Sequence, residues 1–168
     1  QNSTCVGLVY DKKIEEIIEA SIMPSLRSKN IKLLAYPLGA KDHLLEPNDS
    51  IGEAAARSID ASVEILVGAG SGVICDLTKL IADSINRPFI ILGTAASMNA
   101  YTSISGIITI NKFKISKLLK ICDSVIMDTT ILAEAPVEMS RAGMGDLAAR
   151  AICNADFRLS HLLKTTWF

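Results

Sequence analysis

Residues 63–79 read VEILVGAGSGVICDLTK. A short apolar run, Ile65–Val67, leads directly into the glycine-rich segment Gly68–Gly72, and apolar residues at helical spacing follow from Val73. Glycines have no Cβ, so the backbone of such a turn can approach a ligand closely, and the unpaired N–H groups at a helix start attract phosphate. The stretch therefore predicts a strand, a phosphate-binding turn and a helix. The alternative is an ordinary β-to-α turn of an α/β domain.

The stretch departs from the usual dinucleotide-binding pattern. That pattern places an acidic residue at the end of the next strand, where it holds the ribose. Here the next expected strand, Phe89–Leu92, ends in Gly93 and Thr94 without a carboxylate. Asp76 lies instead on the first turn of the helix, and Asp11 ends an earlier strand. Either a nucleotide is held differently or none is bound.

Composition excludes several classes of protein. The chain has 168 residues, and 49% of them are hydrophobic, which predicts a packed core. Its net charge of −1 gives no sign of the basic surface that a nucleic-acid partner would need. No apolar run approaches the ~20 residues that span a bilayer, so no membrane partner is expected. The chain begins at Gln1 rather than Met, which leaves an N-terminal signal open. The four cysteines are scattered without CxxC spacing, which favours small core residues and a reducing, cytoplasmic setting (Cys5, Cys75, Cys122, Cys153).

Apolar runs alternate with helical spacings along most of the chain, which predicts a doubly wound, mostly parallel, Rossmann-like α/β sheet. Strands are expected at Cys5–Tyr10, Ile31–Tyr36, Glu64–Val67, Phe89–Leu92, Gly106–Ile110 and Ser124–Met127. Helices are expected after Asp11 up to Pro24 or the segment Arg27–Asn30, from a capping box at Ser50–Glu53 to Ile59, and from Val73 to Ile85. The lysines of the segment Lys112–Lys120 are expected to form a solvated face.

Ligands of such sheets collect at the carboxyl ends of the strands. Three polar segments are expected there: Asp11, Gly68–Gly72 and Thr94–Ser103. The third is small, rich in hydroxyl groups and uncharged, whereas a plain surface loop more often carries charges. We interpret it as a binding loop, with a tight buried connection as the alternative.

The pattern changes after Ala135 and Pro136 and becomes helical, with no further strand. This predicts one domain over residues 1–135 and the start of an all-α domain, apparently truncated, over residues 136–168. Glycines destabilise a helix interior, so the segment Gly143–Asp146 should mark a helix start or a close approach. Asp146 then faces a ligand or serves as an ordinary helix cap.

Taken together, these segments resemble the iron-containing (group III) alcohol dehydrogenase and dehydroquinate synthase superfamily. Within it they look most like the sn-glycerol-1-phosphate dehydrogenases. The matching segments are Val67–Gly72 with Asp76 and Lys79, then Thr94–Ser103, Ala135–Pro136, Ala142–Asp146 and Ala155–Ser160. Dehydroquinate synthase itself matches less well, because its Gly-Gly-Lys-Thr signature is absent. Glycerol dehydrogenase stays open, since Met127–Ile131 and Ala142–Asp146 resemble it too.

The resemblance implies an NAD- or NADP-dependent, metal-dependent oxidoreductase. Such enzymes interconvert dihydroxyacetone phosphate and glycerol phosphate, so a small phosphorylated polyol would be the substrate and zinc, nickel or iron the divalent metal; it also implies a homo-oligomer. The implied cofactor-binding residues are Asp11, Gly70, Ser71, Gly72, Val73, Ile74, Asp76, Thr94, Ala95, Ser97 and Ser103. Asn99 and Asp146 would contact the substrate, and Asp146 would be the catalytic metal ligand. If Asp11 reaches the ribose, its charge favours NAD over NADP.

Two departures from the family pattern limit the transfer. Asn99 stands where the family has a substrate-contacting acid, and the two downstream metal-binding histidines are missing. His43 precedes the domain boundary, and His161 lies 15 residues past Asp146, roughly 22 Å along a helix. We therefore expect this chain to be inactive alone. The start at Gln1 and the ending Trp167–Phe168 favour a fragment over a natural short nucleotide-binding module without catalysis.

Overall fold

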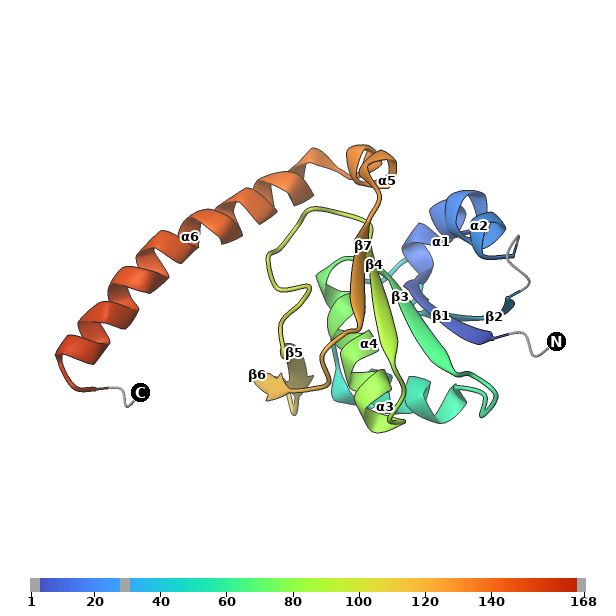
Figure 1. Cartoon of the computed structure of the whole chain (residues 1–168), viewed down its shortest axis with the longest axis horizontal. Coiled ribbons are helices and arrows are strands. Elements are labelled where there is room, and N and C mark those ends of the chain that lie inside the picture. Colours follow the sequence, from blue (N-terminus) through green and yellow to red (C-terminus); the bar gives the residue numbers. More distant parts are fainter. Residues whose placement is uncertain (1–3, 28–30, 166–168) are drawn as a thin grey trace.

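A computed structural model describes residues 4–27 and 31–165. The centre of the fold is a five-stranded sheet in which all neighbouring strands are parallel (Figure 1). In spatial order the strands are β2 (Lys32–Leu38), β1 (Cys5–Asp11), β3 (Ile65–Gly70), β4 (Phe89–Gly93) and β7 (Ser124–Met127). The predicted parallel α/β sheet is confirmed.

The strand order places a switch point in the middle of the sheet. From β1 the chain crosses to β2 on one side, and it then returns to the other side of β1 to form β3. The two crossovers leave β1 in opposite directions, so the connections diverge where β1 and β3 end. Open α/β sheets have their ligand crevice at this point.

Helices cover both faces of the sheet, as doubly wound topology requires. One face carries a continuous helical segment made of η1 (Lys12–Ile14), α1 (Glu15–Ile17), η2 (Ile18–Ile22) and α2 (Met23–Arg27). The other face carries α3 (Asp49–Ser58) and α4 (Gly72–Ser84) (Figure 1). Alternate residues of β1 pack into the two cores, Leu8 with Ile18 on the first face and Val9 with Leu77 on the second. Burial on both faces explains the continuous apolar run of β1.

The first helical segment passes through Pro24, which was one of its two expected ends. Pro24 follows a π-helical turn, Ile18–Ile22, in which the Met23 N–H donates to the Ile18 carbonyl. Such a turn is one of the irregularities that accommodate a proline inside a helix. The helix ends at Arg27, and residues 28–30 of the other expected end lie outside the described residues.

The glycine-rich turn is shorter than the sequence predicts. β3 continues through Gly68 and Gly70, so only Ser71 separates the strand from α4. A Cβ on Gly70 would lie 2.6 Å from Cβ of Ile74, and one on Gly68 would collide with Thr78. These two glycines are therefore needed because α4 packs directly on β3, a close approach of helix to strand.

The capping box expected at Ser50–Glu53 is wrong, because the N-cap lies two residues earlier. α3 begins at Asp49, with Asn48 at the N-cap and without a side-chain cap bond from it. The Asp49 carboxylate accepts the Ser50 N–H at 2.7 Å. Ser50 therefore lies inside the first turn and does not cap the helix.

The basic segment holds a strand that the sequence analysis did not predict. β5 (Ser105–Ile110) pairs with an antiparallel β6 (Phe113–Leu118) in a separate hairpin. The connecting residues, Asn111 and Lys112, have φ of 49° and 68°, which is the backbone of a tight two-residue hairpin turn. All of β6 is exposed, as expected for solvated lysines. The hairpin packs on α4, so it replaces a crossover helix between β4 and β7 (Figure 1).

Two helices follow the last sheet strand. Asp128 caps α5 (Thr129–Glu134) through the N–H groups of Thr130 and Ile131. After Pro136, α6 (Val137–Leu162) runs unbroken and projects from the sheet (Figure 1). No strand follows β7 in the part of the chain that the structure describes. The division at residue 135 stays a prediction, because helical structure after it does not by itself show a separate domain.

The glycines at 143 and 145 do not mark a helix start, since both lie inside α6. Trp167–Phe168 and Gln1, which entered the argument for a fragment, lie outside the described residues. Among the described helices, none combines the length and the apolar composition that crossing a membrane takes.

Candidate functional site

A cleft of about 270 Å³ opens at the switch point of the sheet. Its floor is formed where β1, β3 and β4 end, and its walls come from the first helical segment, the loop after β2 and the start of α6. Seven of the candidate cofactor-binding residues line it: Asp11, Gly70, Ser71, Val73, Ile74, Thr94 and Ala95. The structure thus brings together the three polar segments that the sequence analysis placed at the strand ends.

The N-terminus of α4 forms one side of the cleft. Ser71 is the N-cap residue, and its side chain makes no hydrogen bond to the first turn. The first N–H groups of a 13-residue helix then face the cleft together with the positive end of the helix dipole. A Cβ on Gly72 would lie 3.2 Å from Sδ of Met98, so this turn also lies against the loop after β4. The arrangement is suited to an anionic group.

The first residues of the loop after β4 are fixed to the neighbouring strand end. The Thr94 N–H donates to the Gly70 carbonyl at 3.1 Å. The Tyr101 hydroxyl donates to the Ala95 carbonyl at 2.7 Å, and both residues are buried. Burial raises the pKa of the Tyr101 phenol, which keeps this donor protonated. The loop therefore contributes to the wall of the cleft and is anchored at its two buried residues, Ala95 and Tyr101. Its interpretation as a binding loop stays a prediction.

Asp11 reaches the cleft from the end of β1. Its carboxylate accepts the Lys13 N–H at 2.9 Å and so caps the 3-10 turn η1. Lys13 also lines the cleft, as do Leu44 and Leu45 from the loop after β2. The sequence analysis missed these three residues. The apolar pair Leu44–Leu45 inside an otherwise polar loop was the available signal.

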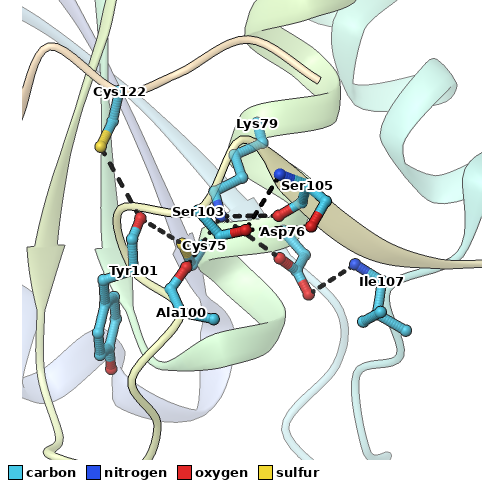
Figure 2. A network of polar contacts seen from close by, with 9 residues as sticks. All are labelled: Cys75, Asp76, Lys79, Ala100, Tyr101, Ser103, Ser105, Ile107 and Cys122. Atoms are coloured by element: carbon cyan, nitrogen blue, oxygen red, sulfur yellow. Dashed lines mark hydrogen bonds and ion pairs between the residues drawn. The ribbon is translucent and has the colours of Figure 1, made fainter. Parts of the chain in front are cut away.

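Four of the predicted cofactor-binding residues do not line the cleft: Gly72, Asp76, Ser97 and Ser103. Asp76 lies two residues after Ile74, about 200° around the helix, and so points away from the cleft. It accepts the Ile107 N–H at 3.2 Å, and the Ser103 and Ser105 hydroxyls are 3.0 Å apart (Figure 2). Burial raises the pKa of Asp76, while the Ile107 N–H and the Lys79 ammonium lower it. Cofactor contact by these four residues stays a prediction.

The loop after β4 also holds α6. The Asn99 backbone N–H donates to the Asp146 carboxylate at 2.7 Å, and Arg150 donates to the Asn99 side-chain oxygen at 2.6 Å. A Cβ on Gly143 would collide with the Ala96 carbonyl, which confirms the expected close approach. Residues 143, 146 and 150 lie on one helix face. The structure thus joins the two predicted substrate residues, Asn99 and Asp146, and adds Arg150, which the sequence analysis missed.

The described residues do not complete a metal site around Asp146. No group of three His, Cys, Asp or Glu side chains that could hold a metal occurs within residues 4–27 and 31–165. His43 lies in the loop between β2 and α3, and His161 lies near the far end of α6. A catalytic zinc site takes three protein ligands, so the residues present do not fit the metal that the family resemblance implies.

Comparison with known proteins finds one matching family and several similar proteins. Residues 1–136 match the family model described as iron-containing alcohol dehydrogenase. A glycerol-1-phosphate dehydrogenase [NAD(P)+] from Bacillus velezensis is 27% identical over 165 residues, covering 93% of this chain and 40% of that protein. One from Caldivirga maquilingensis is 34% identical over 108 residues, covering 62% and 31%. The chain spans less than half the length of these curated relatives.

Solved structures have the same fold. Glycerol dehydrogenase from Schizosaccharomyces pombe superimposes with a TM-score of 0.75 at 22% identity, covering 88% of this chain and 37% of that one. An iron-containing alcohol dehydrogenase from Thermotoga maritima gives 0.71 at 14% identity, covering 86% and 45%. At these identities the likeness establishes the fold alone.

Proposed function

Because this chain belongs to the iron-containing alcohol dehydrogenase family, as its motifs predict, we propose that it is the nucleotide-binding part of an NAD(P)-dependent oxidoreductase. The observation that carries the proposal is the cleft at the switch point, which gathers the ends of β1, β3 and β4 with the N-terminus of α4. Nucleotide sites of open α/β sheets lie at this place.

The cofactor's pyrophosphate fits the start of α4. Backbone N–H groups after Ser71 donate to phosphate oxygens, and the helix dipole favours their charge. In this proposal Thr94 and Ala95 border the nicotinamide half, and Asp11 at the end of β1 faces the ribose. The Asp11 carboxylate repels a 2′-phosphate, which favours NAD, although Lys13, which also lines the cleft, lowers that repulsion.

The chemistry that the cofactor supplies, when bound, is hydride transfer at the nicotinamide ring. The chain's own part is to bind and to orient. The buried Ala95 and Tyr101 keep the loop after β4 in place, and the apolar Leu45 and Ile131 line the cleft. Asn99 of this loop and Asp146 of α6 lie together, where they can hydrogen-bond a hydroxyl-bearing substrate.

The substrate is a small phosphorylated polyol in this proposal, with dihydroxyacetone phosphate and glycerol 1-phosphate interconverted by the complete enzyme. Its support is the name that the curated relatives share. Residues 136–168 would open an α-helical domain, in which Asp146 becomes a metal ligand once residues outside this chain supply the others. In activity assays on a complete protein, turnover of glycerol rather than its phosphate would favour a glycerol dehydrogenase.

The nucleotide site is tested by a charge placed at the start of α4. Ser71→Asp puts a carboxylate beside the phosphate position, but aspartate is a good N-cap, so the fold is kept. We expect calorimetric titration with NADH and NADPH to give at least a tenfold weaker dissociation constant. The thermal midpoint should be unchanged or slightly raised.

Ser50→Asp is the matched control, because it makes the same change in the first turn of α3, which does not line the cleft. It should leave the affinity unaltered. Equal binding by wild type and Ser71→Asp would move the pyrophosphate away from α4. Absence of binding by wild type at millimolar cofactor would contradict the proposed function itself.

A further inference from the structure

A lysine is buried in the middle of α4. Lys79 is 0% exposed, and its Nζ donates to the carbonyls of Ala100 and Ser105, each at 3.1 Å (Figure 2). The third neighbour of the Lys79 Nζ is the Asp76 carboxylate, whose Oδ1 lies 3.9 Å away. An ammonium is rarely placed in a protein interior, because leaving water is costly unless every donor finds a partner. Here the partners are two backbone carbonyls and a carboxylate.

Both carbonyls belong to the segment that leads from the loop after β4 into β5. The Asp76 carboxylate also accepts the Ile107 N–H of β5, at 3.2 Å. The thiols of Cys75 and Cys122 both donate to the Tyr101 carbonyl, at 3.7 and 3.8 Å (Figure 2). Residues 100–107 are thus bound to α4 at several consecutive points, and Lys79 makes the two shortest of these bonds from the helix.

The same loop carries groups of the candidate site on its other side. Thr94 and Ala95 line the cleft, and Asn99 contacts Asp146. Asn99 is adjacent in sequence to Ala100, whose carbonyl Lys79 holds. Lys79 itself does not line the cleft. It can therefore act on a ligand only through the shape of the loop.

We propose that Lys79, paired with Asp76, is a positioning residue that holds the loop 94–105 in the shape that binds the nucleotide. The inference rests on the proposed function for its ligand. It also gives Asp76 a different part from the cofactor contact that the family resemblance implies. α4 then presents its N-terminus to the cofactor and, two turns later, fixes the loop that closes the other side.

The test compares Lys79→Met with Leu77→Ala. Methionine keeps the length of the side chain but cannot donate, so the Ala100 and Ser105 carbonyls lose their partner. Leu77 is buried in the core on the same helix, and its apolar side chain makes no hydrogen bond, so its truncation destabilises without removing the partner of these carbonyls. Cofactor affinity is measured calorimetrically at a temperature where each variant is folded. Amide hydrogen exchange is measured on the same samples.

We expect Lys79→Met to weaken cofactor binding at least tenfold and to speed exchange at the Ser103 and Ile107 amides more than at Tyr10 of β1. The Ser103 N–H donates to the Ala100 carbonyl, so it reports on the loop directly. Leu77→Ala should keep the affinity within twofold and should not speed exchange selectively in the loop. If both variants lose affinity in proportion to their stability, Lys79 is only structural and the proposal is overturned.

Asp76→Asn provides a milder second variant. Its side-chain oxygen can still accept the Ile107 N–H, but the charge that faces Lys79 is gone. We expect an affinity loss of about threefold and faster exchange at Ser103. Should Lys79→Met fail to fold, unchanged affinity and exchange in Asp76→Asn would overturn the proposal. Failure of wild type to bind either nucleotide contradicts the proposed function and not the role of Lys79, which the exchange rates decide alone.

Discussion

At the scale of single residues, burial determines the protonation state of a thiol beneath the loop after β4. The Cys75 thiol is 1% exposed, and burial raises its pKa to about 11. The neighbouring Lys79 ammonium lowers the pKa but does not outweigh the loss of water. Cys75 is therefore a neutral hydrogen-bond donor at physiological pH, which suits its contact with the Tyr101 carbonyl.

This burial makes the free energy of unfolding depend on alkaline pH. Because the thiol pKa is raised in the fold above its ordinary value of 9.0, the unfolded chain loses the proton first. The stabilisation is fully present below pH 9 and is lost as pH rises toward about 11, by about 2 kcal/mol near pH 10.5. Urea unfolding in reductant at pH 8 and pH 10.5 measures the loss. Cys75→Ala should reduce the pH dependence by about this amount.

Cys153 supplies the control for the alkaline experiment. It is exposed on α6, so Cys153→Ala should leave the difference between the two pH values unchanged. The buried Tyr101 also has a raised pKa and titrates in every variant, so the comparison between variants is the informative quantity. An identical pH dependence in wild type and Cys75→Ala would show that water reaches the thiol.

At the scale of elements, the two glycines of α6 have different reasons to be there. Gly143 faces the Ala96 carbonyl with no room for a Cβ, whereas nothing lies within 4 Å of a Cβ on Gly145. The contacts of Asp146 and Arg150 with Asn99 follow on the same helix face. Gly143 therefore allows the helix to reach the loop, and Gly145 only weakens the helix.

Alanine at each position separates these roles. Gly145→Ala should stabilise α6 by up to about 1 kcal/mol through helix propensity alone. Gly143→Ala gains the same propensity but must push the helix from Ala96, so the bond from Asn99 to Asp146 should break. The Asn99 amide resonance reports on this bond. It should shift strongly in Gly143→Ala and little in Gly145→Ala, and equal spectra would contradict the close approach.

The same elements show what could be predicted from sequence. β1 was found because a strand buried on both faces reads as an apolar run, and β4 and β7 were found because they too are short apolar runs. β7 has its predicted bounds, while β1 and β4 are each one residue longer than predicted. β6 was missed because exposed lysines hid the alternation of Phe113 and Ile115 and the Asn111–Lys112 turn. The glycines of β3 were read as a turn because a sequence does not say whether a missing Cβ faces a ligand or a helix.

The residues at the strand ends of the candidate site were predicted better than the residues that helix packing and turns bring to it. Asp11, Ser71 and Thr94 were found because parallel topology alone brings strand ends together. Arg150 and Lys13 were not found, because their place depends on how a helix and a turn pack. The same limit applies to Asp76, whose contact with the hairpin was not expected and whose contact with a cofactor stays a prediction.

At the scale of the whole molecule, the described chain offers one carboxylate where the family resemblance implies a metal. Asp146 has a hydrogen bond from Asn99 but no cluster of other ligands among the described residues. Zinc bound by one carboxylate is held weakly, since a catalytic site takes three protein ligands.

We therefore expect this 168-residue chain to bind much less than one equivalent of zinc or nickel after dialysis. Asp146→Ala should leave that content unchanged, and in a complete protein it should abolish metal content and turnover while cofactor affinity stays nearly intact. Elemental analysis gives the metal content. Stoichiometric metal in the short chain, lost on Asp146→Ala, would mean that other residues complete the site.

The strand order has a consequence for synthesis on the ribosome. β1 occupies an interior position of the sheet but precedes both of its neighbours in the chain, and its partner on one side, β3, begins 59 residues after the paired Val6. At about 5–20 residues per second, the apolar run Cys5–Tyr10 waits roughly 3–12 s before that partner is made. Transiently exposed apolar surface of this kind is prone to aggregation. The five strands therefore cannot be added to the sheet in spatial order as they are made, and a pause in translation before Ile65 would prolong the exposure of this apolar run.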